Sequence, residues 1–89
     1  MAANNRIFAL KGDVLEVTLP EGRSQIELVD ISRSEIRTMA QQFHGMDLKI
    51  SGRITTGMAL MLGHELAHIT KSVSIFDPKD NVYVLCVRH

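Results

Sequence analysis

The stretch LKISGRITTGMALMLGHELAHITKSVSIFDP, residues 48–78, carries the clearest structural pattern in the chain. Residues 48–51 form a short run of strand-favouring residues, and a glycine-containing turn follows. The threonines that open residues 55–70 can provide N-cap hydroxyls to a helix over that range. Residues 72–76 are again rich in strand formers. A strand, a helix and a second strand form a βαβ unit, so the two strands are expected to be parallel and the connection right-handed.

Two hairpins are predicted at the ends of the chain. Residues 6–10 and 14–19 flank a Lys-Gly-Asp turn, and the second run alternates apolar and polar residues. Beyond an Asp-Pro turn, residues 82–87 (VYVLCV) form an apolar run that can pair with residues 72–76.

A second helix is predicted over residues 32–44. Ser32 and Glu35 have the Ser-x-x-Glu spacing of a capping box, and apolar residues follow at helical intervals. The ambiguous run at residues 25–31 leaves an earlier start open. Residues 44–45, a His-Gly pair, are typical of a helix C-terminus, because glycine tolerates the left-handed conformation there.

These elements predict an α+β fold. We expect a single small two-layer domain over residues 1–89, with a mixed sheet of about five strands and two amphipathic helices on one face. One βαβ unit is expected within it.

Composition limits the classes of function. The formal net charge of zero argues against a long nucleic-acid tract bound by counterion release, but not against a small anionic ligand. Apolar residues make up 45% of the chain without the run of about 18 that a membrane span needs, and residues 1–5 lack the features of a signal peptide. Cys86 lies in an apolar run, so we expect a buried, reduced thiol and a cytoplasmic protein.

His64, Glu65 and His68 fit the pattern H-E-x-x-H. Two histidines four residues apart share one face of a helix and can bind zinc, with the glutamate as the general base of a peptidase. No third ligand follows: position 74, six residues after His68, is a serine, and the next strand begins almost at once. The alternative interpretation places His64 on the surface and leaves His68 alone functional.

Ser51, Gly52 and Arg53 lie between a strand and a helix N-terminus. Anions bind at such places in open α/β sheets, because unpaired N–H groups and the helix dipole point at them. Asp77 ends the neighbouring strand at the same edge of the sheet, as a candidate metal ligand or general base, with Lys79 beside it for phosphate. For residues 51–53 the alternative is an ordinary turn between a strand and a helix. For Asp77 the alternative is a carboxylate that only starts an Asp-Pro turn.

Helix length separates two of these candidates. At 1.5 Å per residue the predicted helix spans ~20 Å, so His68 and Asp77 should lie at opposite poles of one subunit. If both serve one reaction, another subunit stacked pole to pole must complete the site. His89 is expected on the His68 side.

Four segments together resemble a known family, the third CRISPR-associated ring nuclease family of type III systems. They are I-S-G-R (residues 50–53), H-E-L-A-H (64–68), V-S-I-F-D-P-K (73–79) and the closing His89. The similarity covers nearly half of the chain, and the N-terminal half is similar only in its hairpin-then-helix layout. Relatives usually continue for another strand or so beyond the position of His89.

The resemblance implies a small homodimer that cleaves cyclic tetraadenylate and so switches off type III CRISPR antiviral signalling. It also implies dependence on Mn²⁺ and, as a second activity, removal of 3′ adenylates from short oligoadenylate RNA. In this family two dimers stack head to tail around the ligand. Neither DNA nor a membrane is an expected partner.

The same resemblance implies residue roles. The catalytic histidine and aspartate fall on His68 and Asp77. Substrate-binding positions fall on Ser51, Gly52, Arg53, Lys79 and His89, and Asp77 and His89 are the candidate metal ligands. The first alternative is a non-catalytic sensor that binds the cyclic nucleotide and leaves the ring intact. The zinc peptidase is a second, less favoured alternative.

Overall fold

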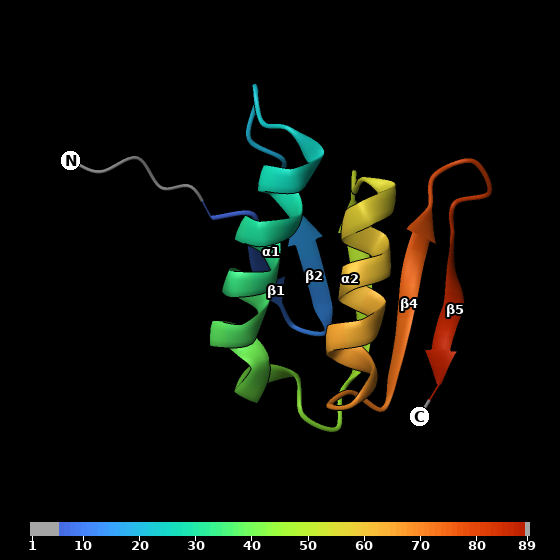
Figure 1. Ribbon diagram of the computed structural model, residues 1–89. Helices are drawn as coiled ribbons and strands as arrows, with labels where there is room; N and C mark the ends of the chain where they lie inside the picture. Colours follow the sequence, from blue (N-terminus) through green and yellow to red (C-terminus); the bar gives the residue numbers. More distant parts are fainter. Residues whose placement is uncertain (1–5, 89) are drawn as a thin grey trace.

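A five-stranded mixed sheet runs through residues 6–88, the part of the chain that the computed structural model describes (Figure 1). Its strands lie in chain order across the sheet: β1 (Phe8–Lys11), β2 (Val14–Val17), β3 (Asp47–Gly52), β4 (Ser72–Asp77) and β5 (Val82–Arg88). The three central strands are parallel, and each edge strand is antiparallel to its neighbour. The predicted α+β class, the βαβ unit β3–α2–β4 and both hairpins are therefore confirmed. A second such unit, β2–α1–β3, was not predicted.

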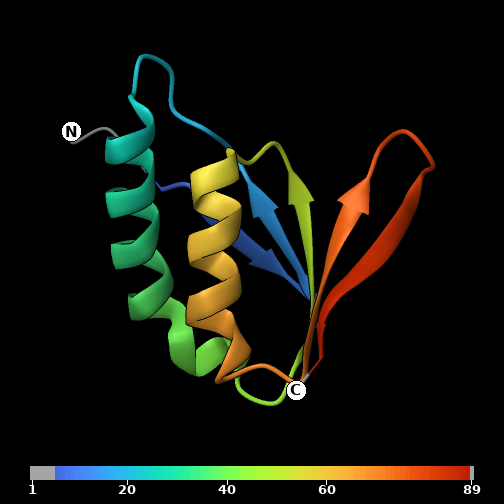
Figure 2. The same cartoon turned by 45° about the vertical axis from the view of Figure 1, so that its right-hand side comes forward.

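Both helices lie on the same face of the sheet (Figure 2). They are α1 (Gln25–Met39), which continues into a 3₁₀ turn η1 (Ala40–Phe43), and α2 (Thr56–Ala67). The core lies between the helices and the sheet, and its fully enclosed apolar residues include Phe8, Leu15, Ile36, Phe43, Leu48, Met58, Leu62 and Leu66. None of the helices in residues 6–88 combines the length and the apolarity that a membrane crossing requires.

The start of α1 corrects the prediction. The sequence contains Ser-x-x-Glu twice, and the first copy, Ser24 with Glu27, caps the helix. Glu27 N donates to Ser24 Oγ at 3.2 Å, and Ser24 N donates to Glu27 Oε1 at 2.9 Å. Ser32 is not the cap, because it is buried in the middle of the helix, and the earlier start that residues 25–31 left open is the correct one. The predicted end near residues 44–45 agrees with the end of η1 at Phe43.

Glu35 also differs from its predicted role as a capping residue. Its carboxylate accepts hydrogen bonds from Ile7 N at 2.9 Å and from Phe8 N at 2.8 Å. Because β1 is an edge strand, these two N–H groups have a side-chain acceptor instead of a further strand. Glu35 therefore ties the middle of α1 to the outer edge of the sheet.

The predicted N-cap of α2 is confirmed at Thr55, whose Oγ1 accepts a hydrogen bond from Met58 N at 3.2 Å. The helix ends at Ala67, three residues before the predicted end at Thr70. There Thr70 closes the last turn, because its N and its Oγ1 both donate to the carbonyl oxygen of Leu66. His68 is thereby the C-cap residue of α2.

The β4–β5 hairpin diverges from the rest of the sheet. Pairing between β3 and β4 covers only the first part of β4 and ends at Ile50 with Ile75, and beyond that point the two strands separate (Figure 2). The helices do not cover β5, so most of its side chains are exposed. Cys86 is exposed as well, and the prediction of a buried thiol was wrong, because an apolar run was mistaken for a covered strand.

Candidate functional site

The predicted anion-binding residues lie at the carboxyl end of the central strands. Ser51 and Gly52 end β3, Arg53 follows it, and Asp77 ends the parallel strand β4. Since parallel strands end at the same edge of a sheet, all four residues lie at one pole of the molecule, the upper pole in Figure 1. We call it the β-end pole. The Arg53 side chain is exposed and forms no ion pair within residues 6–88.

Gly52 has a structural reason to be glycine. Its φ is 118°, a conformation that residues with a side chain rarely adopt, and a Cβ there would collide with the carbonyl oxygen of Val17 in β2. The close approach of β2 therefore requires glycine at this position without any ligand.

The N-terminus of α2 is partly satisfied from within the chain. Met58 N bonds the Thr55 hydroxyl, and Gly57 N donates to the side-chain Oε1 of Gln25 at 2.7 Å. A helix N-terminus leaves its first N–H groups without intrahelical partners, and two of those groups are occupied here. Gln25 thus borders the predicted anion site from α1. No local sequence pattern indicates this contact, because 32 positions separate the two partners.

Asp77 is held by a local turn. Its Oδ1 accepts a hydrogen bond from Lys79 N at 3.0 Å, as predicted for an Asp-Pro turn, and residues 78–81 connect β4 to β5. The other carboxylate oxygen and the Lys79 amine have no hydrogen-bond or ionic partner among the described residues. Because β3 and β4 diverge here, no such bond joins Asp77 to Arg53 in this part of the chain.

His68 lies at the opposite pole. It is the C-cap residue of α2, a helix of 12 residues that spans about 18 Å. The strand β4 begins four residues after His68, and its six residues span a similar length before they reach Asp77. One phosphodiester group cannot contact both side chains of a single molecule. We call this end the His68 pole. His89 falls outside the described residues.

The H-E-x-x-H segment is arranged differently from the zinc-site prediction. The rings of His64 and His68 meet edge to face with centroids 5.8 Å apart. Glu65, however, accepts two hydrogen bonds from the Arg37 guanidinium, each at 3.0 Å. This bidentate pair lowers the pKa of Glu65 and fixes its carboxylate toward α1. Within residues 6–88, moreover, no group of three or more His, Cys, Asp or Glu side chains is arranged to hold a metal ion.

Asp77 is the candidate Mn²⁺ ligand among the described residues. Ions of this kind are bound by one or two carboxylates together with substrate phosphates. Asp77 offers one carboxylate oxygen without a partner among the described residues, half-buried at the pole that also carries the cations Arg53 and Lys79. The donor chemistry therefore fits a metal that binds together with its substrate.

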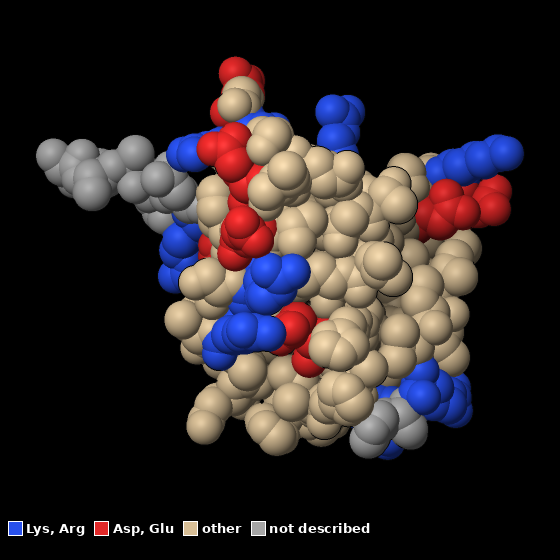
Figure 3. Space-filling model, in the orientation of Figure 1, with Lys and Arg blue, Asp and Glu red and all other residues tan. Residues whose placement is uncertain are grey.

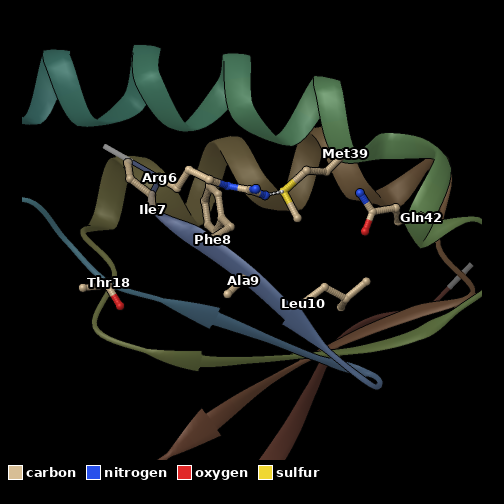
Figure 4. A pocket seen from close by; sticks show the side chains of 8 residues that line it. All are labelled: Arg6, Ile7, Phe8, Ala9, Leu10, Thr18, Met39 and Gln42. Atoms are coloured by element: carbon tan, nitrogen blue, oxygen red, sulfur yellow. Dashed lines mark hydrogen bonds between the residues drawn. The ribbon is translucent and has the colours of Figure 1, made fainter. Parts of the chain in front are cut away.

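A separate hollow of about 520 Å³ lies at the other edge of the sheet, between β1 and the end of α1 (Figure 4). Arg6 extends along it, and its Nη2 lies 3.9 Å from the sulfur of Met39. The remaining lining residues are Ile7, Phe8, Ala9, Leu10, Thr18 and Gln42. No residue predicted to act on a substrate lies in it.

Charge is unevenly distributed over the face that carries the helices. Lys, Arg, Asp and Glu gather along α1 and at the two ends of the β4–β5 hairpin, and the area between is largely uncharged (Figure 3).

No protein-family model, no curated protein and no solved structure matches the chain.

Proposed function

We propose that this protein is a metal-dependent ring nuclease that cleaves phosphodiester bonds of cyclic tetraadenylate and thereby switches off type III CRISPR antiviral signalling. The observation that carries the proposal is the placement of Arg53, Asp77 and Lys79 at one pole and His68 at the other. This placement suits a site that two stacked molecules share. Removal of 3′ adenylates from short RNA would use the same groups.

The β-end pole would bind the ring. Arg53 offers a planar guanidinium that can donate two hydrogen bonds to one phosphate, and the Lys79 ammonium adds a second positive charge. Ser51 adds a side-chain hydroxyl beside them. Asp77, with His89 as a further candidate, would hold Mn²⁺, which when bound supplies neutralisation of the phosphate charge.

His68 would move the proton. Its imidazole is exposed, and histidine is the side chain most often used for general acid–base work. Supplied by the next molecule, it would take a proton from the attacking oxygen or give one to the leaving oxygen of the phosphodiester that Arg53 holds.

The proposed assembly is a homodimer, with dimers stacked head to tail on the ligand. Stacking would bring the His68 pole of one molecule onto the β-end pole of the next. A cyclic tetranucleotide has a repeating structure, so it can present equivalent phosphates to a two-fold protein. Action in the cytoplasm follows from this role and is part of the proposal.

The test is complementation between two inactive variants. Purified protein is incubated with cyclic tetraadenylate and Mn²⁺, and the linear products are separated by chromatography. We expect His68→Ala and Asp77→Ala to be inactive alone and their mixture to recover part of the wild-type rate, because mixed stacks contain intact pairs. His64→Ala is the matched control and should retain full activity.

The other outcomes separate the alternatives. A mixture as inactive as its components would contradict the shared site. Tight binding of a ring that stays intact in the wild-type protein would favour the non-catalytic sensor, and absence of binding would reject the ligand.

A further inference from the structure

Six of the ten lysine and arginine residues are paired with carboxylates at 2.6–3.8 Å. The pairs are Arg6–Glu35, Lys11–Glu16, Arg23–Glu27, Arg33–Asp30, Arg37–Glu65 and Lys49–Asp13. The other four have no ionic or hydrogen-bonded partner for the side chain within residues 6–88: Arg53, Lys71, Lys79 and Arg88.

These four cations lie at the two poles. Arg53 and Lys79 follow β3 and β4 at the β-end pole. Lys71 directly precedes β4, and Arg88 ends the antiparallel strand β5 opposite Ser72, the first residue of β4. Lys71 and Arg88 therefore belong to the same end of the sheet as His68, and basic side chains are visible at that end of β5 in Figure 3.

A hollow of about 280 Å³ opens between them, lined by Lys71, Arg88, Asp47 and Ser72. The carboxylate of Asp47 accepts a hydrogen bond from Ser72 Oγ at 2.6 Å and forms no ion pair with either cation. The described lining residues thus contribute two positive groups and one carboxylate. The hollow is smaller than the ~300–1,000 Å³ of sites that enclose a whole ligand, so it suits one charged part of a larger molecule.

The backbone beneath these side chains is fixed although their charged groups are free. Lys71 N donates to Met46 O at 2.8 Å, and Arg88 lies within the β4–β5 ladder. An exposed cation on a fixed backbone can bind an anion without rearranging the fold. Because neither cation has a partner among residues 6–88, no ion pair in this part of the chain has to be broken first.

We infer that Lys71 and Arg88 form a second binding site for phosphodiester groups, at the His68 pole. The inference rests on the proposed function and extends it. In a head-to-tail stack this pole faces Arg53 and Lys79 of the next molecule, so the oligonucleotide backbone is held by cations from both sides. Lys71 and Arg88 position the substrate beneath His68 of the same molecule.

The test measures binding of a fluorescent cyclic tetraadenylate in a His68→Ala parent, where the ring stays intact. We expect Lys71→Ala/Arg88→Ala to bind roughly tenfold or more weakly, since two charge-assisted contacts are lost. The slope of log K against log salt should fall by about 1.4, at roughly 0.7 for each lost phosphate contact. Ligand-induced stacking, followed by sedimentation velocity, should be lost as well.

Arg33→Ala is the matched control for Arg88→Ala, because it removes a partly exposed arginine, paired with Asp30, from the middle of α1 and away from both poles. Lys71→Arg/Arg88→Lys keeps both charges and should keep the parent's salt slope. A double alanine variant that binds and stacks like the Arg33→Ala control would overturn this inference and leave the proposed function standing. A parent that binds no ring would instead reject the proposed function, and this site with it.

Discussion

Ser32 is a buried polar residue without a hydrogen-bond partner for its hydroxyl among the described residues. It faces the core from the middle of α1, between Leu28 and Ile36. A buried hydroxyl without a partner costs free energy, so its removal should stabilise the fold.

We expect Ser32→Ala to raise the free energy of unfolding by about 1 kcal/mol, measured by urea denaturation. Alanine also favours helix more than serine does, and the exposed Ser34→Ala on the same helix isolates that contribution. Equal gains in the two variants would mean that the Ser32 hydroxyl carries no desolvation cost.

The contact between the two helices at Gln25 and Gly57 has a functional consequence at the scale of elements. Gln25 occupies an N–H group at the N-terminus of α2, next to Arg53. A phosphate bound at this pole, as proposed, would compete with that side chain for the N–H group. The Gln25 side chain should therefore lower the affinity of the β-end pole for anions.

We expect Gln25→Ala to bind cyclic tetraadenylate roughly two- to fivefold more tightly, as a freed helix N-terminus contributes a few tenths of a kcal/mol to about 1 kcal/mol. Fluorescence polarisation measures this change, and the exposed Gln41→Ala is the control. Weaker binding would show that Gln25 itself contacts the ligand.

Elements fixed by near neighbours were predictable from the sequence. The Thr55 cap joins residues three positions apart, and the turn at Asp77 joins residues two positions apart. Contacts across the fold were not predictable: Gln25 reaches Gly57 over 32 positions, and Glu35 reaches Ile7 over 28. The same limit applies to the unpaired cations, because whether a lysine or arginine forms an ion pair depends on which residues the fold brings close to it.

The start of α1 was missed for a different reason. Ser-x-x-Glu occurs at both Ser24 and Ser32, and local spacing cannot distinguish them. The structure distinguishes them: Ser32 is buried in the core in the middle of α1, whereas Ser24 lies at the end of the helix. Burial of Cys86 was mispredicted similarly, since an apolar strand is covered only if a neighbour lies over it.

At the scale of the whole molecule, β5 is an uncovered apolar edge. Val82, Val84 and Leu85 are 49%, 43% and 46% exposed, and β5 is the last strand of the sheet. A long, apolar edge strand offers unpaired N–H and C=O groups to another strand. This edge is the surface by which we expect the proposed dimer to form.

We expect Leu85→Lys to convert the dimer to a monomer, because a charged side chain on each of two paired edges opposes their association. Sedimentation equilibrium measures the change. Ile26→Lys, at a residue 76% exposed on α1, introduces the same charge away from the edge and should leave the mass unchanged. A dimer that persists in Leu85→Lys would place the interface elsewhere.

The collision that a side chain at Gly52 would cause also bears on inheritance. Any substitution there disturbs the pairing of β2 with β3, so a descendant that had lost every activity would still be selected to keep glycine. Arg53 has no such protection, because its side chain has no partner among the described residues. Among diverging copies of this protein, the arginine should therefore change soon after function is lost, and the glycine should remain.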